Sequence, residues 1–206
     1  LLHQFDNLRA LSDRPLHERV SCHFLPTLCL HGEPLQRPAI PVTQLFLQRG
    51  IRHPEQIALL EPGQHKRCYG RLLASVQSLA GILRVQGIGV GDRVAIFLPR
   101  CADAVTAMLA TLWTGAAYIP LDPDGPAQRI NTILQHAQPS LLLTRRSLQE
   151  KIGTTARPTV LLMDAVGSTA PAPLPLLNPV VVDDRAPAYL IYTSGSTGVP
   201  NGVEIS

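Results

Sequence analysis

The apolar positions of this chain fall into two alternating patterns. Short apolar runs are separated by segments in which apolar residues recur three or four positions apart. After Tyr69 the apolar residues fall on one face of a helix, namely Leu72, Leu73, Val76, Leu79, Ala80 and Leu83. Residues 93–98 (RVAIFL) form a continuous run rich in branched and aromatic side chains, which is typical of a buried strand. The pattern therefore predicts alternating helices and strands.

The same signals predict the remaining elements. We expect strands at residues 57–60, 117–121, 141–144, 160–163 and 188–192, an extended segment at 203–205, and helices at 102–113 and 126–137. Strands that alternate with helices form a parallel sheet, because each crossover helix returns the chain to the same edge. The predicted fold class is α/β, with a mainly parallel sheet and flanking helices.

Proline divides the chain into segments. It makes up 19 of 206 residues and gathers between Pro15 and Pro62 and again between Pro171 and Pro187. Within the first cluster, the prolines between Pro26 and Pro41 leave no room for a long helix. Before it, leucines at helical spacing between Leu1 and Leu11 indicate the last helix of something that begins upstream. We therefore expect residues 1–41 to hold that end and a linker, and residues 42–206 to belong to a second domain.

Composition excludes several classes of protein. With 45% hydrophobic and 16% charged residues, the chain can bury a core and is not wholly disordered. Its 18 basic residues are scattered and exceed the acidic ones by only three, which argues against nucleic-acid binding. Residues 104–121 are apolar enough to consider a membrane helix, but Gly115 and Pro120 favour helix, turn and strand. Four cysteines without disulfide spacing predict reduced thiols and a cytoplasmic protein.

The most informative segment follows the last predicted strand. Residues 193–202 read TSGSTGVPNG, with three glycines and four hydroxyl side chains in ten residues. Glycines let successive backbone N–H groups converge on phosphate oxygens, and hydroxyl groups add donors. A plain hairpin turn is the alternative interpretation. The dinucleotide pattern G-x-G-x-x-G is absent, and so is the phosphate-loop pattern G-x-x-x-x-G-K-[ST], because Val199 and Pro200 follow Gly198.

Three separated motifs resemble one family. Residues 192–203 (YTSGSTGVPNGV) resemble the phosphate-binding motif of adenylate-forming enzymes, specifically the adenylation domains of nonribosomal peptide synthetases. Residues 113–123 (WTGAAYIPLDP), followed by Pro126, Arg129 and Ile130, resemble a second core motif of that family. Residues 42–46, 53–58 and 68–72 resemble the family's opening helix, strand and helix entry. The order is correct in all three, so residues 42–206 are similar to an N-terminal part of the adenylate-forming fold.

The resemblance implies a reaction and its participants. In this family a carboxylate attacks the α-phosphorus of ATP, giving an acyl-adenylate and pyrophosphate, and the acyl group then passes to a phosphopantetheine thiol on a carrier protein. The implied substrate is an amino acid, the implied cofactors are ATP and Mg²⁺, and the implied partners are condensation and peptidyl-carrier domains of the same assembly line. Residues 1–20 resemble the tail of a condensation domain. The phosphate-binding residues carried over are Thr193, Ser194, Gly195, Ser196, Thr197, Gly198 and Gly202.

The resemblance also predicts what this chain does not supply. The family usually has lysine where this sequence has Asn201, so a cation near the departing pyrophosphate is missing. The family's substrate pocket, Mg²⁺ acid and catalytic lysine would lie beyond Ser206, so no catalytic residue is assigned and the chain by itself is expected to be inactive. The alternatives are a piece of an acyl-CoA or aryl-acid ligase, and a non-catalytic remnant or interaction module.

Other reactive side chains have simpler explanations. A zinc site is disfavoured because its four candidate ligands lack the usual spacing; they are Cys22, His23, Cys29 and His31. Asp122 and Asp124 fit a turn before a helix better than a metal site. Cys68 and Cys101 stand at predicted helix starts, and Trp113 is expected in the core or at an interdomain contact. No metal ligand is therefore assigned.

Overall fold

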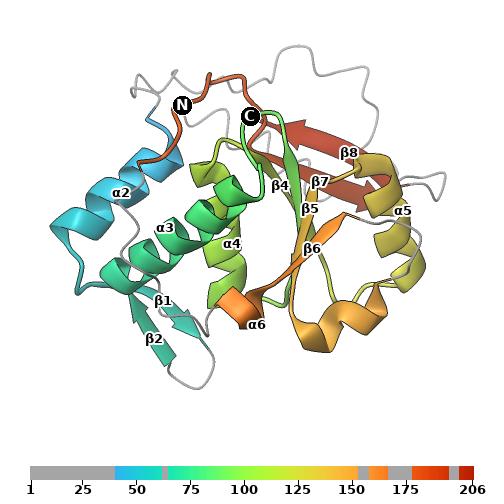
Figure 1. The fold of residues 1–206 in the computed structure, drawn as a ribbon, viewed down its shortest axis with the longest axis horizontal. Coiled ribbons are helices and arrows are strands. Elements are labelled where there is room, and N and C mark those ends of the chain that lie inside the picture. Colours follow the sequence, from blue (N-terminus) through green and yellow to red (C-terminus); the bar gives the residue numbers. More distant parts are fainter. Residues whose placement is uncertain (1–39, 62–64, 153–157, 167–177, 195–199) are drawn as a thin grey trace, which may run out of the picture. The chain divides into compact units, whose positions relative to one another are not determined.

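A six-stranded sheet organises the molecule in the computed structural model, which describes residues 40–61, 65–152, 158–166, 178–194 and 200–206 (Figure 1). The spatial order of the strands is β6-β5-β3-β4-β7-β8. Their bounds are β3 (Arg93–Phe97), β4 (Ala117–Leu121), β5 (Leu141–Thr144), β6 (Thr159–Leu162), β7 (Tyr189–Ser194) and β8 (Pro200–Ile205). The first five strands in this order run parallel, and β8 pairs antiparallel with β7. The predicted α/β class with a mainly parallel sheet is confirmed.

Helices cover both faces of the sheet, as Figure 1 shows. Helices α3 (Tyr69–Val85) and α4 (Ala102–Trp113) pack on one face together with α2 (Val42–Arg52), and α5 (Ala127–Ala137) packs on the other. Within β3, Val94 and Ile96 join the first core, whereas Ala95 and Phe97 join the second. Successive strand residues point to opposite faces, so a strand buried on both sides must be apolar throughout.

The first core is closed by aromatic side chains. Trp113 is fully buried at the end of α4, and its ring meets Phe46 of α2 edge-on at a centroid distance of 6.3 Å. Phe46 in turn lies 6.2 Å from the ring of Tyr69 at the start of α3. Three helices distant in sequence therefore meet at one cluster. The prediction that Trp113 belongs to the core is confirmed.

The apolar stretch at residues 104–121 folds as helix, turn and strand, as predicted. Gly115 makes the turn after α4 with a φ of 84°, and a Cβ there would lie only 2.7 Å from Cγ2 of Val90. A side chain at this position would be strained by both its backbone angle and its neighbours. Across the described ranges, no helix combines the length and apolar character needed to span a bilayer.

Three elements were not predicted. Strand β2 (His65–Cys68) pairs antiparallel with β1 (Ile57–Glu61), and the short helices η2 (Arg146–Lys151) and α6 (Met163–Val166) follow β5 and β6. β2 reads HKRC and has no apolar alternation, so its extended conformation depends on pairing with β1. Short helices carry too few residues for a periodic signal.

Predicted boundaries differ from the structure by small amounts. β3 ends one residue early, β6 is shifted one residue back, and Pro126 precedes α5 instead of opening it. β7 begins one residue late but runs on through Thr193 and Ser194. The expected end of a preceding domain, the linker up to residue 39 and the candidate zinc ligands lie outside the described residues.

Candidate functional site

The carboxyl ends of the parallel strands meet at one edge of the sheet. After β3 the chain enters α4 on one face, and after the neighbouring β4 it enters α5 on the opposite face. In open α/β sheets ligands bind outside the carboxyl ends of the strands at such a point, because the two departing chains leave a crevice. β7 lies beside β4, so its carboxyl end, followed by the glycine-rich segment, reaches the same edge.

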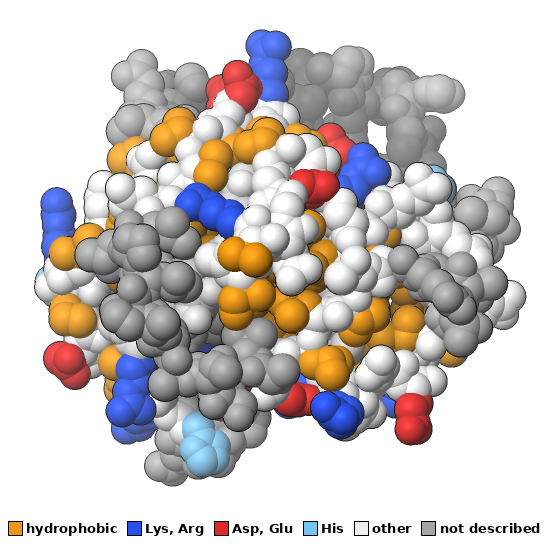
Figure 2. Space-filling model, viewed as in Figure 1, with side chains coloured by type: hydrophobic (Ala, Val, Ile, Leu, Met, Phe, Trp, Pro, Cys, Tyr) orange, Lys and Arg blue, Asp and Glu red, His pale blue; other side chains and the backbone are white. Residues whose placement is uncertain are grey.

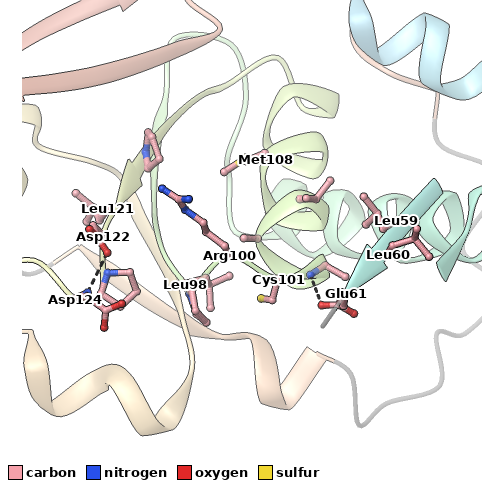
Figure 3. A pocket seen from close by; sticks show the side chains of 16 residues that line it. Leu59, Leu60, Glu61, Leu98, Arg100, Cys101, Met108, Leu121, Asp122 and Asp124 are labelled. Carbon is pink, nitrogen blue, oxygen red and sulfur yellow. Dashed lines mark hydrogen bonds between the residues drawn. The ribbon is translucent and has the colours of Figure 1, made fainter. Parts of the chain in front are cut away.

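A cavity of about 710 Å³ opens at this edge (Figure 3). Leu98 and Arg100 after β3, and Asp122 and Asp124 after β4, line it, together with Glu61 of β1. The backbone N–H of Asp124 donates to Oδ1 of Asp122 at 3.0 Å, and Gly125 N–H donates to the Asp122 carbonyl. The interpretation of the two aspartates as a turn is confirmed. Within the described ranges, no three His, Cys, Asp or Glu side chains gather into a potential metal site.

The amino end of α4 is fixed by charged side chains beside the cavity. Oε1 of Glu61 accepts a hydrogen bond from the Ala102 N–H at 2.6 Å, which satisfies one of the unpaired donors of the helix. Asp103 lies 2.8 Å from the guanidinium of Arg145 and 3.6 Å from that of Arg67. The hydrogen bond from Arg145 to Asp103 raises the pKa of Arg145. These pairs join β1, β2 and the segment after β5 to the start of α4.

The two described cysteines occupy the positions predicted for them. Cys68 and Cys101 directly precede α3 and α4, and both are half-buried. A guanidinium nitrogen of Arg145 lies 3.5 Å from Sγ of Cys101. The thiol therefore takes part in the packing at the helix start.

The glycine-rich segment begins and ends in a β-hairpin. Thr193 pairs with Asn201, and Tyr192 pairs with Gly202. Ser194 pairs with Pro200 as the last pair of the ladder before the turn. The structure thus brings Thr193, Ser194 and Gly202 of the predicted site together near the turn end of the hairpin, while Gly195, Ser196, Thr197 and Gly198 lie outside the described residues. Thr193 and Asn201 are exposed on neighbouring strands.

Two side chains of helix α5 contact Tyr192, the residue that precedes the predicted site. A guanidinium nitrogen of Arg129 donates to the Tyr192 carbonyl oxygen at 3.0 Å, and Nδ1 of His136 lies 2.8 Å from the Tyr192 phenol oxygen. Burial raises the pKa of Tyr192, and the nearby positive charge of Arg93 partly opposes this shift. Sequence reasoning assigned no role to Arg129 or His136. The available signal was that Arg129 belongs to the second core motif, which begins at Trp113.

The comparison with protein families decides the relationship. The family model described as "AMP-binding enzyme" matches residues 46–206. The chain belongs to this family. The match covers most of the described structure, and the β7–β8 hairpin lies within the matched region.

Relatives of this chain include several peptide synthetases. It is 38% identical over 201 residues to isonitrile lipopeptide synthase of Streptomyces coeruleorubidus, covering 95% of this chain and 13% of the relative. It is 35% identical over 166 residues to tyrocidine synthase 2 of Brevibacillus parabrevis, covering 81% of this chain and 4% of the relative. The chain therefore spans only a small part of the curated relatives that it matches.

Solved structures with this fold include adenylation enzymes. The Klebsiella oxytoca NpsA N-terminal subdomain superposes with a TM-score of 0.71 at 28% identity, covering 80% of this chain and 41% of that one. The nonribosomal peptide synthetase FmoA3, bound to α-methyl-L-serine-AMP, gives a TM-score of 0.71 at 29% identity, covering 85% and 19%. The resemblance to an N-terminal part of the peptide-synthetase adenylation fold is confirmed.

Proposed function

We propose that this AMP-binding chain supplies the triphosphate-binding part of an amino-acid-activating adenylation domain in a nonribosomal peptide synthetase. The complete domain would join the amino-acid carboxylate to the α-phosphorus of ATP and release pyrophosphate. The observation that carries the proposal is the β7–β8 hairpin, in which Thr193 and Ser194 form the carboxyl end of β7, close to Gly202 of β8, while β7 itself lies beside β4. FmoA3, a structural relative, is described with an aminoacyl-AMP bound.

The hairpin supports phosphate binding through its donors. We assign the contacts to Thr193, Ser194, Gly195, Ser196, Thr197, Gly198 and Gly202. Backbone N–H groups and hydroxyls there would hold the β- and γ-phosphates while the α-phosphorus is attacked, so their work is positioning and charge stabilisation. Among the described residues, no three acidic, His or Cys side chains gather into a site for Mg²⁺. Such a cluster is not required, because Mg²⁺ is commonly held in part by the phosphate oxygens of the substrate.

Further parts of the proposal concern the complete protein. Residues 1–41 are proposed to be the end of a condensation domain and its linker, and residues 42–206 the N-terminal part of the adenylation domain. The activated amino acid would pass to the phosphopantetheine thiol of a peptidyl-carrier domain. A cytoplasmic location would give such an enzyme its ATP. On the face in Figure 2, Lys and Arg side chains are dispersed and form no continuous basic stripe.

Nucleotide binding and catalysis by the 206-residue chain can be measured separately. The 206-residue chain is expected to bind pyrophosphate and ATP with similar affinity and AMP more weakly, because the proposed contacts are to the β- and γ-phosphates. Isothermal titration in the presence of Mg²⁺ measures this order. The chain is also expected to give no amino-acid-dependent exchange of radioactive pyrophosphate into ATP. Tighter binding of AMP than of pyrophosphate would refute the proposed contacts. Amino-acid-dependent exchange of pyrophosphate into ATP by the 206-residue chain would refute the expectation that the catalytic groups lie outside it.

Asn201→Lys is expected to tighten binding of pyrophosphate about fivefold, since one added unit charge near a phosphate is worth about 1 kcal/mol in water. Asn201 is exposed opposite Thr193, so the longer side chain can reach out beside the hairpin without displacing packed atoms. Asn178→Lys is a matched control, because Asn178 is also exposed but stands before β7, away from the turn. Equal affinities in wild type and Asn201→Lys at low salt would count against a phosphate at this position.

A further inference from the structure

Tyr192 connects helix α5 to the hairpin. Its ring meets His136 edge-on, with centroids 5.7 Å apart and planes at 85°, and its phenol oxygen lies 2.8 Å from Nδ1 of the same histidine. Its carbonyl oxygen accepts the hydrogen bond from Arg129. Arg129 lies in the first turn of α5 and His136 in the last, so the two ends of one helix hold one residue of β7.

The next residue along the chain is Thr193, the first of the predicted phosphate contacts. A peptide plane held at the Tyr192 carbonyl also fixes the direction of the following N–H, because the two groups belong to one planar unit. The bond from Arg129 is charge-assisted and half-buried, which makes it stronger than a neutral hydrogen bond in water. No carboxylate among the described residues forms an ion pair with Arg129, so its charge is directed to the hairpin.

Gly202 allows this arrangement from the opposite strand. It pairs with Tyr192, and a Cβ at Gly202 would lie 3.0 Å from Cζ and 3.2 Å from the phenol oxygen of Tyr192. Contacts this short would force the ring to move, and with it the oxygen that meets His136. The glycine at this position therefore serves the ring of Tyr192 in addition to any contact with phosphate.

We propose that Arg129 and Tyr192 are positioning residues, which set the carboxyl end of β7 for the phosphate-binding turn without touching the ligand. This inference rests on the proposed function of the hairpin. Helix α5 is the rigid element in this arrangement, because Ile130, Ile133 and Leu134 bury its other side against the sheet. β7 pairs with β4 at its start, through Tyr189, and the contacts of Tyr192 with the helix hold the later part of the strand.

The test compares variants of the full 206-residue chain by hydrogen–deuterium exchange without ligand. In Arg129→Met, exchange of amides at residues 189–194 and 201–205 is expected to rise about tenfold, because a hydrogen bond to a charged group is lost. Exchange in β3 and β5 is expected to be unchanged. Arg129→Lys, which keeps a charged donor, is expected to recover part of the protection. Tyr192→Phe, which keeps the ring and the carbonyl, is expected to raise exchange only about threefold, as for a neutral hydrogen bond. Arg146→Met serves as the control, because it removes an exposed charge that follows the carboxyl end of β5, away from the hairpin.

Pyrophosphate titration of the same variants separates the two proposals. Binding is expected to weaken about tenfold in Arg129→Met and to recover in part in Arg129→Lys. Weakened binding without faster exchange would make Arg129 a direct ligand of phosphate and overturn the positioning role. Unchanged exchange with unchanged binding would overturn it as well. Faster exchange of the hairpin in a chain whose wild type binds no pyrophosphate would uphold the positioning role and contradict the proposed function.

Discussion

Trp113→Ala is expected to lower the free energy of unfolding by about 3 to 5 kcal/mol, as large aromatic-to-alanine changes in cores do. The side chain is fully buried, and it is where α4 meets Phe46 of α2. Its removal loses the transfer free energy of the indole and leaves a cavity that three packed helices cannot close without moving. Urea unfolding followed by far-ultraviolet circular dichroism measures the change.

Val85→Ala is the matched control for this prediction. Val85 is the last residue of α3 and is 85% exposed. Its truncation opens no cavity, so the free energy of unfolding is expected to change by no more than about 0.5 kcal/mol. A loss in Trp113→Ala as small as that of the control would show that α2 does not pack on α4 in solution.

The double variant Thr193→Val and Ser196→Ala is expected to weaken pyrophosphate binding by at least about a hundredfold. Each hydroxyl is proposed to donate to a charged phosphate oxygen, and such bonds contribute about 1.5 to 3 kcal/mol each. Thr193 is exposed at the end of β7, and valine keeps its branched shape, so the melting temperature is expected to stay the same. Isothermal titration with Mg²⁺ and pyrophosphate gives the affinity.

The control removes the same two functional groups elsewhere. Thr159 is exposed at the start of the far edge strand β6, and Ser147 is exposed in η2. The double variant Thr159→Val and Ser147→Ala is expected to bind pyrophosphate like the wild type. If both double variants bind pyrophosphate equally well, the hydroxyl groups of the hairpin do not hold phosphate.

Much of the fold could be predicted because its strands are buried on both faces. The runs at β3 and β5 contact both cores with successive apolar residues, and this makes them visible in the sequence. Helices α3 and α4 were found for the related reason that each has one continuous buried face. The strand β2 carries no such signal, because its residues are exposed or half-buried and polar.

The residue types of the candidate site were predicted, but the contacts of helix α5 with Tyr192 were not. Glycine and hydroxyl side chains follow one another at residues 193–198, so a local pattern reveals them. The contact between His136 and Tyr192 joins residues 56 positions apart, and the one from Arg129 joins residues 63 apart. Nothing local in the sequence marks such partners, because they depend on the register of β7 against α5. The motif containing Arg129 indicated its importance but not its contact.

The most direct test of the central claim is amide chemical-shift mapping of the ¹⁵N-labelled chain during titration with Mg²⁺ and pyrophosphate. If the hairpin binds phosphate, the largest chemical-shift changes will fall on the amides of residues 193–199, 201 and 202, with smaller changes at Arg129 and Tyr192. If the chemical shifts of those amides stay constant while the shifts of the amides around Arg100 and Asp122 change, the polyphosphate binds in the neighbouring cavity and the account is wrong.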